Sequence, residues 1–228
     1  MPTILISNKT GQNIDLVKEL IRKCPRRERN LPNGFLIEHI YQVLGYGTVI
    51  SGISGIDIDK NSTLYLGPFE NGSFVQVGIK NMHNDYRFNV EQIAVGQRGC
   101  LNIRIKDKIN IRKGMILSHT IPTNICKRFI ANMRICHHPT TIQTGYNAMV
   151  SIGTINEPAR IVSMYVKDKP DVILNAARTG DIITVEMEFL KHLNFVKTGQ
   201  KLVFREGGIR GIGEVVSHIP LSVQDGIS

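Results

Sequence analysis

The sequence predicts a mainly β protein built of two consecutive antiparallel β-barrels, preceded by a short βα segment. Short apolar runs that alternate with polar residues follow one another over residues 35–118 and again over 127–219, and glycine or proline turns separate them. The clearest pattern is Tyr41 to Gly55, YQVLGYGTVISGISG, in which an alternating strand meets a second β-branched run at Gly45 and Gly47. Glycine adopts the positive φ angles that a tight hairpin requires. We therefore expect this hairpin to open the first barrel.

Turn residues and composition divide the chain into five parts. We expect a βα unit over residues 1–24, a linker over 25–34, a first barrel over 35–120, a second barrel over 125–220 and a tail over 221–228. Residues 35–118 contain about six or seven short strands, which is the density of a closed barrel.

The first 24 residues hold one β-rich run and one amphipathic helix. Thr3 to Ile6 favours a strand, and Asn13 is a typical helix N-cap ahead of a helix that Pro25 ends. The apolar stripe of this helix consists of Ile14, Val17, Leu20 and Ile21. One strand and one helix cannot bury that stripe by themselves. The stripe must dock on the barrels, stay disordered or pair with a second copy, and we favour a homodimer through residues 1–24.

The composition favours a soluble cytoplasmic protein. The chain has 228 residues, of which 42% are hydrophobic, and no apolar run approaches the roughly 18 residues of a membrane span. Met1 to Lys23 carries no signal-peptide pattern. The 4 cysteines lack CxxC spacing, so free thiols are expected rather than disulfides or a zinc site.

The charge favours a polyanionic partner. There are 28 Lys+Arg residues against 19 Asp+Glu residues, a net charge of +9. Lysine and arginine gain affinity for a phosphate backbone by releasing its counterions. The linker CPRRERNLPN carries Arg26 and Arg27 and is either a solvated connector or a contact to such a backbone.

No catalytic constellation is present in the sequence. A phosphate-binding loop has the pattern GxxxxGK[ST], and no such string occurs. Asn8 and Lys9 are followed by Thr-Gly, so they do not form an NKxD guanine motif. We therefore expect this chain alone neither to bind GTP tightly nor to hydrolyse it, and we assign no catalytic and no metal-binding residue.

Several strings resemble one family. The hairpin G-x-G-T-V-x-x-G at Gly45 to Gly52 is similar to the one that opens the second domain of translational GTPases such as elongation factor Tu and elongation factor one alpha. Leu66-Gly67-Pro68 and Arg112 to Met115 also resemble the second domain of this family. The H-P-x-x-I-x-x-G-Y pattern ending at Tyr146 and the string Leu202 to Gly207 are similar to the third domain of elongation factor one alpha. The Val49 to Gly52 ending and the His-His-Pro-Thr-Thr-Ile string look most like the branch called GTP-binding protein one and two.

The resemblance implies roles for particular residues. S-N-x-T-G-x-N at the start of the chain is similar to the fifth motif of the GTPase domain, so Ser7, Asn8 and Lys9 would help to hold a guanine base. GTP and Mg²⁺ would then require a GTPase domain that supplies the phosphate loop. At the hairpin, Tyr46 stands where elongation factor Tu has an arginine.

Two functional classes follow. The barrels are either an RNA-facing module for tRNA, ribosomal RNA or mRNA, working with a GTPase domain, or a protein-docking module that contacts an exchange or decay partner without RNA. Basic residues alternate with apolar ones near residues 98–113, which gives either an RNA face or a solvated face. The candidate RNA-facing residues are Arg26, Arg27, Arg104, Lys106, Arg112, Lys113, Arg205 and Arg210. Phe74, Tyr86 and Phe88 are expected to pack in the core.

Overall fold

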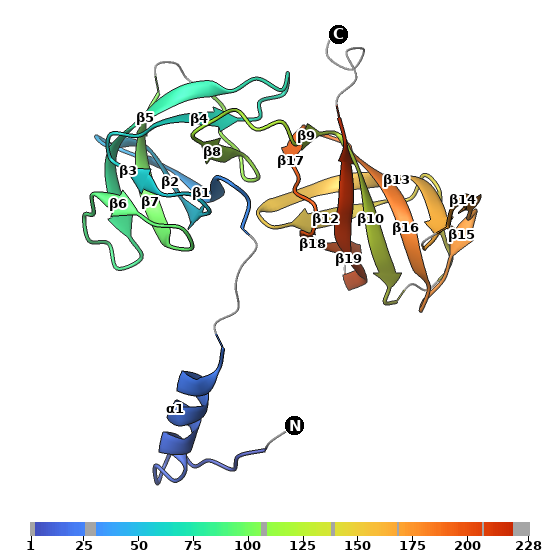
Figure 1. Cartoon of the computed structure of the whole chain (residues 1–228), viewed down its shortest axis with the longest axis horizontal. Helices are drawn as coiled ribbons and strands as arrows, with labels where there is room; N and C mark the ends of the chain where they lie inside the picture. Colours follow the sequence, from blue (N-terminus) through green and yellow to red (C-terminus); the bar gives the residue numbers. More distant parts are fainter. Residues whose placement is uncertain are drawn as a thin grey trace.

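The computed structural model describes residues 3–25, 31–105, 109–137, 140–167, 169–206 and 208–220, without the side chains of 170 and 209. It shows two β-barrels side by side and one helix at the N-terminal end (Figure 1). The predicted fold class, two consecutive antiparallel barrels, is confirmed. Arg26, Arg27 and Lys106 lie outside the described residues.

The first barrel is a closed sheet in which every strand pairs antiparallel with its neighbours, in the order β1-β2-β7-β5-β4-β8. Its strands are β1 (Phe35–Val43), β2 (Gly47–Ser54), β4 (Thr63–Gly67), β5 (Val75–Asn84), β7 (Arg98–Arg104) and β8 (Ile116–Ser118). A small separate ladder joins β3 (Ile58–Asp59) to β6 (Gln92–Ile93).

Alternation explains the interior of this barrel. Phe35 and Ile37 of β1, Ile50 of β2 and Leu101 of β7 are fully buried. A bulge between Ile37 and His39 shifts the register of β1 against β2. The bulge shifts the alternation by one residue, so that Ile40 packs against the core while Tyr41 and Val43 are exposed on the outer face.

The second barrel is also closed, because β12 pairs with both β18 and β13. The strand order is β12-β18-β19-β10-β16-β13, and β14 is added to the edge of β13. The strands are β10 (Arg128–Ile135), β12 (Asn147–Ile152), β13 (Ile155–Val166), β14 (Lys169–Ile173), β16 (Ile182–Phe189), β18 (Lys201–Glu206) and β19 (Gly208–Ile219). Two short ladders join β9 (Ile125–Cys126) to β17 (Asn194–Phe195) and β11 (Ile142–Gln143) to β15 (Ala176–Ala177).

A small apolar cluster joins the two barrels. Leu36, Ile53 and Ile116 of the first barrel are buried together with Phe195 of the second. The amino group of Lys197 also donates to the carbonyl of Leu31, at 3.2 Å. The barrels therefore share an interface with its own hydrophobic centre.

The N-terminal unit differs from its prediction in two respects. The helix α1 (Ile14–Lys23) has the predicted position, but no strand forms at Thr3 to Ile6. A strand requires a partner for its backbone groups, and none of the described residues pairs with this segment. Asn13 does not cap the helix through its side chain; its amide instead donates to the carbonyl of Leu5, at 2.8 Å.

None of the residues of α1 is buried, and Leu20 and Ile21 are 47% and 66% exposed. Figure 1 shows the helix standing apart from both barrels. Within the described ranges, no helix is long and apolar enough to cross a membrane.

Candidate functional site

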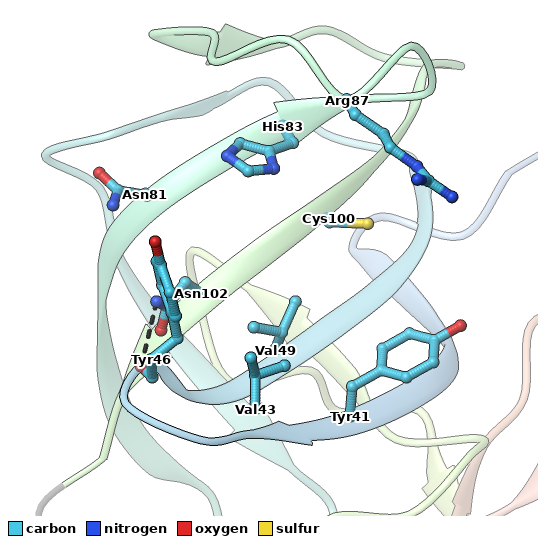
Figure 2. A pocket seen from close by; sticks show the side chains of 9 residues that line it. All are labelled: Tyr41, Val43, Tyr46, Val49, Asn81, His83, Arg87, Cys100 and Asn102. Carbon is cyan, nitrogen blue, oxygen red and sulfur yellow. Dashed lines mark hydrogen bonds between the residues drawn. The ribbon is translucent and has the colours of Figure 1, made fainter.

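A pocket of about 480 Å³ lies on the outer face of the first barrel, beside the hairpin that joins β1 to β2. Figure 2 shows the side chains that line it. They are Tyr41, Val43, Tyr46, Val49, Asn81, His83, Arg87, Cys100 and Asn102.

The strand register brings these residues together. Tyr41 of β1 is paired with Val49 of β2, and Val49 is paired with Asn102 of β7. Asn102 is in turn opposite Asn81 of β5, and Cys100 is opposite His83. Directly opposed side chains lie on the same face of a sheet. The pocket floor is therefore a row that crosses four neighbouring strands.

The β1–β2 hairpin forms one wall of the pocket. Gly45 and Gly47 have φ angles of 79° and 93°, as the hairpin prediction required. They flank Tyr46, whose N–H donates to the carbonyl of Val43 at 3.0 Å. Tyr46 is 64% exposed as a residue and lines the pocket, so its aromatic ring is accessible there.

Asn102 is the buried polar residue of the pocket. It is only 8% exposed, and its Nδ2 donates to the carbonyl of Tyr46 at 3.2 Å. Its Oδ1 is buried and accepts no hydrogen bond from any described residue. A buried acceptor without a donor carries a free-energy cost, so Oδ1 is a place where a bound hydrogen-bond donor would be stabilising.

The loop after β5 forms the opposite wall. The Oδ1 atom of Asn84 accepts hydrogen bonds from the N–H groups of Tyr86 and Phe88, both at 3.0 Å, and Arg87 has a φ of 64°. This tight turn points Tyr86 and Phe88 outward, with exposures of 80% and 67%. The prediction that these two aromatic residues pack in the core is wrong, because the turn that carries them projects from the barrel. Phe74, in contrast, packs against the cluster between the barrels.

Arg112 lies in the interface between the barrels. Its Nη1 donates to Asn194 Oδ1 at 2.9 Å and lies 3.4 Å from Glu157 Oε1, and its Nη2 donates to the carbonyl of Leu193. Burial lowers the pKa of Arg112, while the charges of Glu157 and Glu70 oppose that change. Every one of these partners is internal, so Arg112 is not among the residues that we propose to contact RNA.

The other predicted basic residues are dispersed. Arg104, at the end of β7, and Lys113 are exposed on the first barrel. On the second barrel, Arg205 is exposed and donates to Asn156 Oδ1 at 3.0 Å, while Arg210 is half-buried and its Nε has no partner among the described residues. The structure therefore does not gather them into one cluster.

The residues predicted for the guanine loop form a turn at the N-terminal end. The Oγ of Ser7 accepts from the N–H of Thr10 at 3.3 Å, and the carbonyl of Ser7 accepts from the N–H of Gly11 at 2.9 Å. Asn8 and Lys9 are exposed. No group of three or more His, Cys, Asp or Glu residues suited to a metal ion occurs among the described residues.

Sequence reasoning missed most of the pocket. It singled out Tyr46 but not Asn81, His83 or Asn102, because these are single polar residues on two separate strands, β5 and β7. One available signal was that Tyr41, Val43 and Val49 are apolar at positions that the alternation places outside the barrel. Large apolar residues on a solvent-facing strand surface indicate a contact site.

Two relatives match 94% of the chain and a third matches 73% of it. The chain is 35% identical over 222 residues to GTP-binding protein 1 of Xenopus laevis, an alignment that covers 94% of this chain and 32% of that protein. It is 30% identical over 225 residues to GTP-binding protein 2 of Homo sapiens, covering 94% and 36%. Elongation factor 1-alpha of Methanocaldococcus jannaschii is 26% identical over 171 residues, covering 73% and 37%. The chain thus spans about a third of the length of these relatives.

Solved structures share the fold. The structure of sup35 complexed with GDP has a TM-score of 0.71 at 22% identity and covers 83% of this chain and 48% of its own. The apo form of translation elongation factor SelB from Methanococcus maripaludis has a TM-score of 0.73 at 20% identity, covering 96% and 50%. No protein-family model matches the sequence. The resemblance deduced from the hairpin and the later strings is confirmed: the chain belongs to the translational GTPase family and corresponds to its C-terminal barrel domains.

Proposed function

We propose that this chain is the RNA-facing barrel module of a translation-factor-like GTP-binding protein, and that the pocket on the first barrel holds one unpaired nucleotide. The observation that supports this most strongly is the buried, unpartnered Oδ1 of Asn102 in a pocket with an exposed aromatic ring, that of Tyr46, at its edge. A nucleobase offers both a π face and N–H donors, so it matches the two features together.

The dimensions and walls of the pocket support this proposal. Its volume of about 480 Å³ falls within the range of small-molecule sites. Tyr41, Tyr46 and Val49 offer apolar surface, and stacking of a base on an aromatic ring requires no particular sequence. The exocyclic amine of a base would donate to Asn102 Oδ1.

The charge distribution would hold the rest of the RNA. Arg87 lines the pocket, and Arg104 is exposed at the end of β7, the strand that also carries Asn102. A phosphate backbone that enters the pocket would pass close to such residues, and each neutralised phosphate would release counterions. The net charge of +9 favours the same partner.

Binding to total tRNA tests this function. The equilibrium constant is measured for the full chain at about 50 mM and about 200 mM salt, and a steep fall in log K against log salt, equivalent to several phosphate contacts, is expected. Tyr46→Ala should weaken binding by about fivefold or more through lost stacking. Tyr65→Ala, on β4 of the same barrel and outside the pocket lining, is the matched control and should bind as the unmodified chain does.

A protein-docking module is the alternative. The exposed apolar side chains around the pocket favour it, since Leu44 is 100% exposed and Tyr86 and Phe88 are exposed nearby. No tRNA binding at the lower salt concentration would reject the RNA-facing function and leave docking to a protein partner as the better account.

The binding and hydrolysis of GTP would require a separate domain. We infer that GTP and Mg²⁺ are bound by a GTPase domain and not by this chain, because its sequence has no phosphate-binding loop. A fluorescent GTP analogue titrated against the purified chain should show no tight binding. Turnover that persists through repurification and follows this polypeptide would contradict the inference.

A further inference from the structure

A second cavity, of about 590 Å³, lies at the seam between the two barrels. Phe69 lines it from the turn that joins β4 to β5, and Val75 from the start of β5. Ile109 and Met115 line it from the segment before β8, and His192 lines it from the second barrel. It is separate from the pocket beside Tyr46, because the two share no lining residue. Cavities at domain interfaces are common places for small ligands.

One of the lining residues, His192, has a ring nitrogen without a hydrogen-bond partner in the part of the chain that the structure describes. Its Nδ1 is buried and has no hydrogen-bond partner among the described residues. The backbone of His192 is held on both sides, because its N–H donates to Glu157 Oε2 at 3.3 Å and its carbonyl accepts from Asn194 Nδ2 at 3.2 Å. These two hydrogen bonds fix the backbone that carries the imidazole. In a neutral imidazole, one of the two ring nitrogens accepts a hydrogen bond.

The charges around the cavity favour a cationic ligand. The guanidinium of Arg112 lines it, but Glu157, Asn194 and three carbonyl groups already bind that guanidinium. Glu70, in contrast, is exposed at the cavity and forms no ion pair with a described residue. The carboxylate of Glu70 thus has no ion pair among the described residues, although its charge also acts on Arg112.

We propose that this cavity binds a small aromatic cation that carries an N–H donor. The aromatic ring would lie against the apolar walls of Phe69 and Ile109, its N–H would donate to His192 Nδ1, and its positive group would face Glu70. Such a ligand contacts both barrels at once, so it would stabilise their observed arrangement. This site is independent of the RNA-facing function proposed for the first barrel.

Three indole compounds test the proposal on the full chain by calorimetry. Tryptamine has both the N–H donor and the cation, 1-methyltryptamine lacks the donor, and indole-3-acetate reverses the charge. We expect 1-methyltryptamine to bind about tenfold more weakly than tryptamine, and indole-3-acetate more weakly still. Equal affinity for the two amines, or no binding of tryptamine at millimolar concentration, would overturn the proposal.

Variants and NMR locate the site. His192→Phe should remove the difference in affinity between tryptamine and 1-methyltryptamine, and Glu70→Gln should weaken the binding of tryptamine. Glu91→Gln, on the outside of the same barrel, is the control and should change neither result. Tryptamine should shift the ¹⁵N resonance of His192 Nδ1 in the unmodified chain. Shifts at the amides of Tyr46 and Asn102 instead of those of Phe69 and His192 would place the ligand in the other pocket and refute the assignment.

Discussion

Arg112 of the first barrel and Glu157 of the second form an ion pair across the interface, with Nη1 3.4 Å from Oε1 and side-chain exposures of 16% and 9%. Asn194 binds both side chains, because its Oδ1 accepts from Arg112 and its Nδ2 donates to Glu157 Oε2 at 3.2 Å. The carboxylate is therefore paired and hydrogen-bonded although it is buried. Together with the apolar cluster around Phe195, this network connects the two barrels.

Removing the guanidinium should destabilise the chain strongly. Arg112→Ala leaves Glu157 buried without its countercharge, and we expect a loss of about 3–5 kcal/mol in the free energy of unfolding, measured with urea. The control is Arg98→Ala, which breaks an exposed pair with Glu38 whose side chains are 50% and 26% exposed, and which should cost no more than about 1 kcal/mol. Equal effects of the two substitutions would show that the interface does not depend on Arg112.

Lowering the pH should reduce the stability of the second barrel, because it protonates the carboxylate of Glu188. Burial raises the pKa of Glu188, but the hydrogen bond from Arg160 at 2.7 Å and the charges of Arg128, Arg160 and Lys127 outweigh burial and hold this pKa below its ordinary value of 4.5. A lowered folded-state pKa means that the carboxylate stabilises the fold above the unfolded pKa and loses this contribution as the pH falls through the folded value.

The substitution Glu188→Gln isolates that contribution. At pH 7 this substitution should lower the free energy of unfolding by about 1–3 kcal/mol. The difference in free energy of unfolding between the variant and the unmodified chain should become smaller at pH values below the ordinary glutamate pKa of 4.5. Denaturation with urea at pH 7 and at about pH 3 measures both values. A difference that is the same at both pH values would show that the charge of Glu188 is not responsible.

Three of the four cysteines should differ in reactivity with their burial. Cys24 and Cys136 are exposed, whereas Cys126 is buried in the second barrel, and burial raises its pKa to about 12. A thiolate is the reactive form, so Cys126 should resist a disulfide reagent until the chain unfolds, while Cys24 and Cys136 react at once. Mass spectrometry of the labelled peptides identifies each site. Rapid labelling of Cys126 in the folded chain would contradict its placement in the core.

Asn102 should matter for ligand binding more than for stability. Asn102→Leu removes the unpartnered Oδ1 and fills its place with apolar atoms, so the free energy of unfolding should change by less than about 1.5 kcal/mol. Binding of tRNA should nevertheless weaken by about fivefold or more if a base donates to this oxygen. Asn71→Leu, in an exposed turn outside this pocket, is the matched control. Unchanged binding by Asn102→Leu would remove this residue from the proposed site.

The helix α1 should drive self-association. Leu20 and Ile21 of its apolar stripe are 47% and 66% exposed, and apolar side chains left in water cost free energy that a partner would recover. Sedimentation at micromolar concentration should show a dimer for the full chain and a monomer for a version that begins at Leu31. Two monomers, together with slow amide exchange over residues 14–21 in the full chain, would show that the helix docks on its own barrels instead.

Local patterns determined the barrels and the hairpin. Alternation of apolar residues along each strand, and glycine at positions 45 and 47, are properties of neighbouring residues, so they predicted strands, turns and the two-barrel fold directly. The same holds for α1, whose helical spacing and following Pro25 gave its bounds. The strings around these elements also carried the resemblance to translational GTPases.

The tertiary structure decided the functional surfaces. Asn81, Asn102 and Val49 become neighbours only through the strand order β2-β7-β5, which no local pattern encodes. In the sequence, Arg112 is one of several basic residues near residues 98–113. Its partners Glu157 and Asn194 belong to the second barrel and come close to it only in the folded structure. Whether a polar side chain faces a ligand, a partner domain or water depends on residues distant in the chain, and this is the physical reason why the sequence alone left these sites undecided.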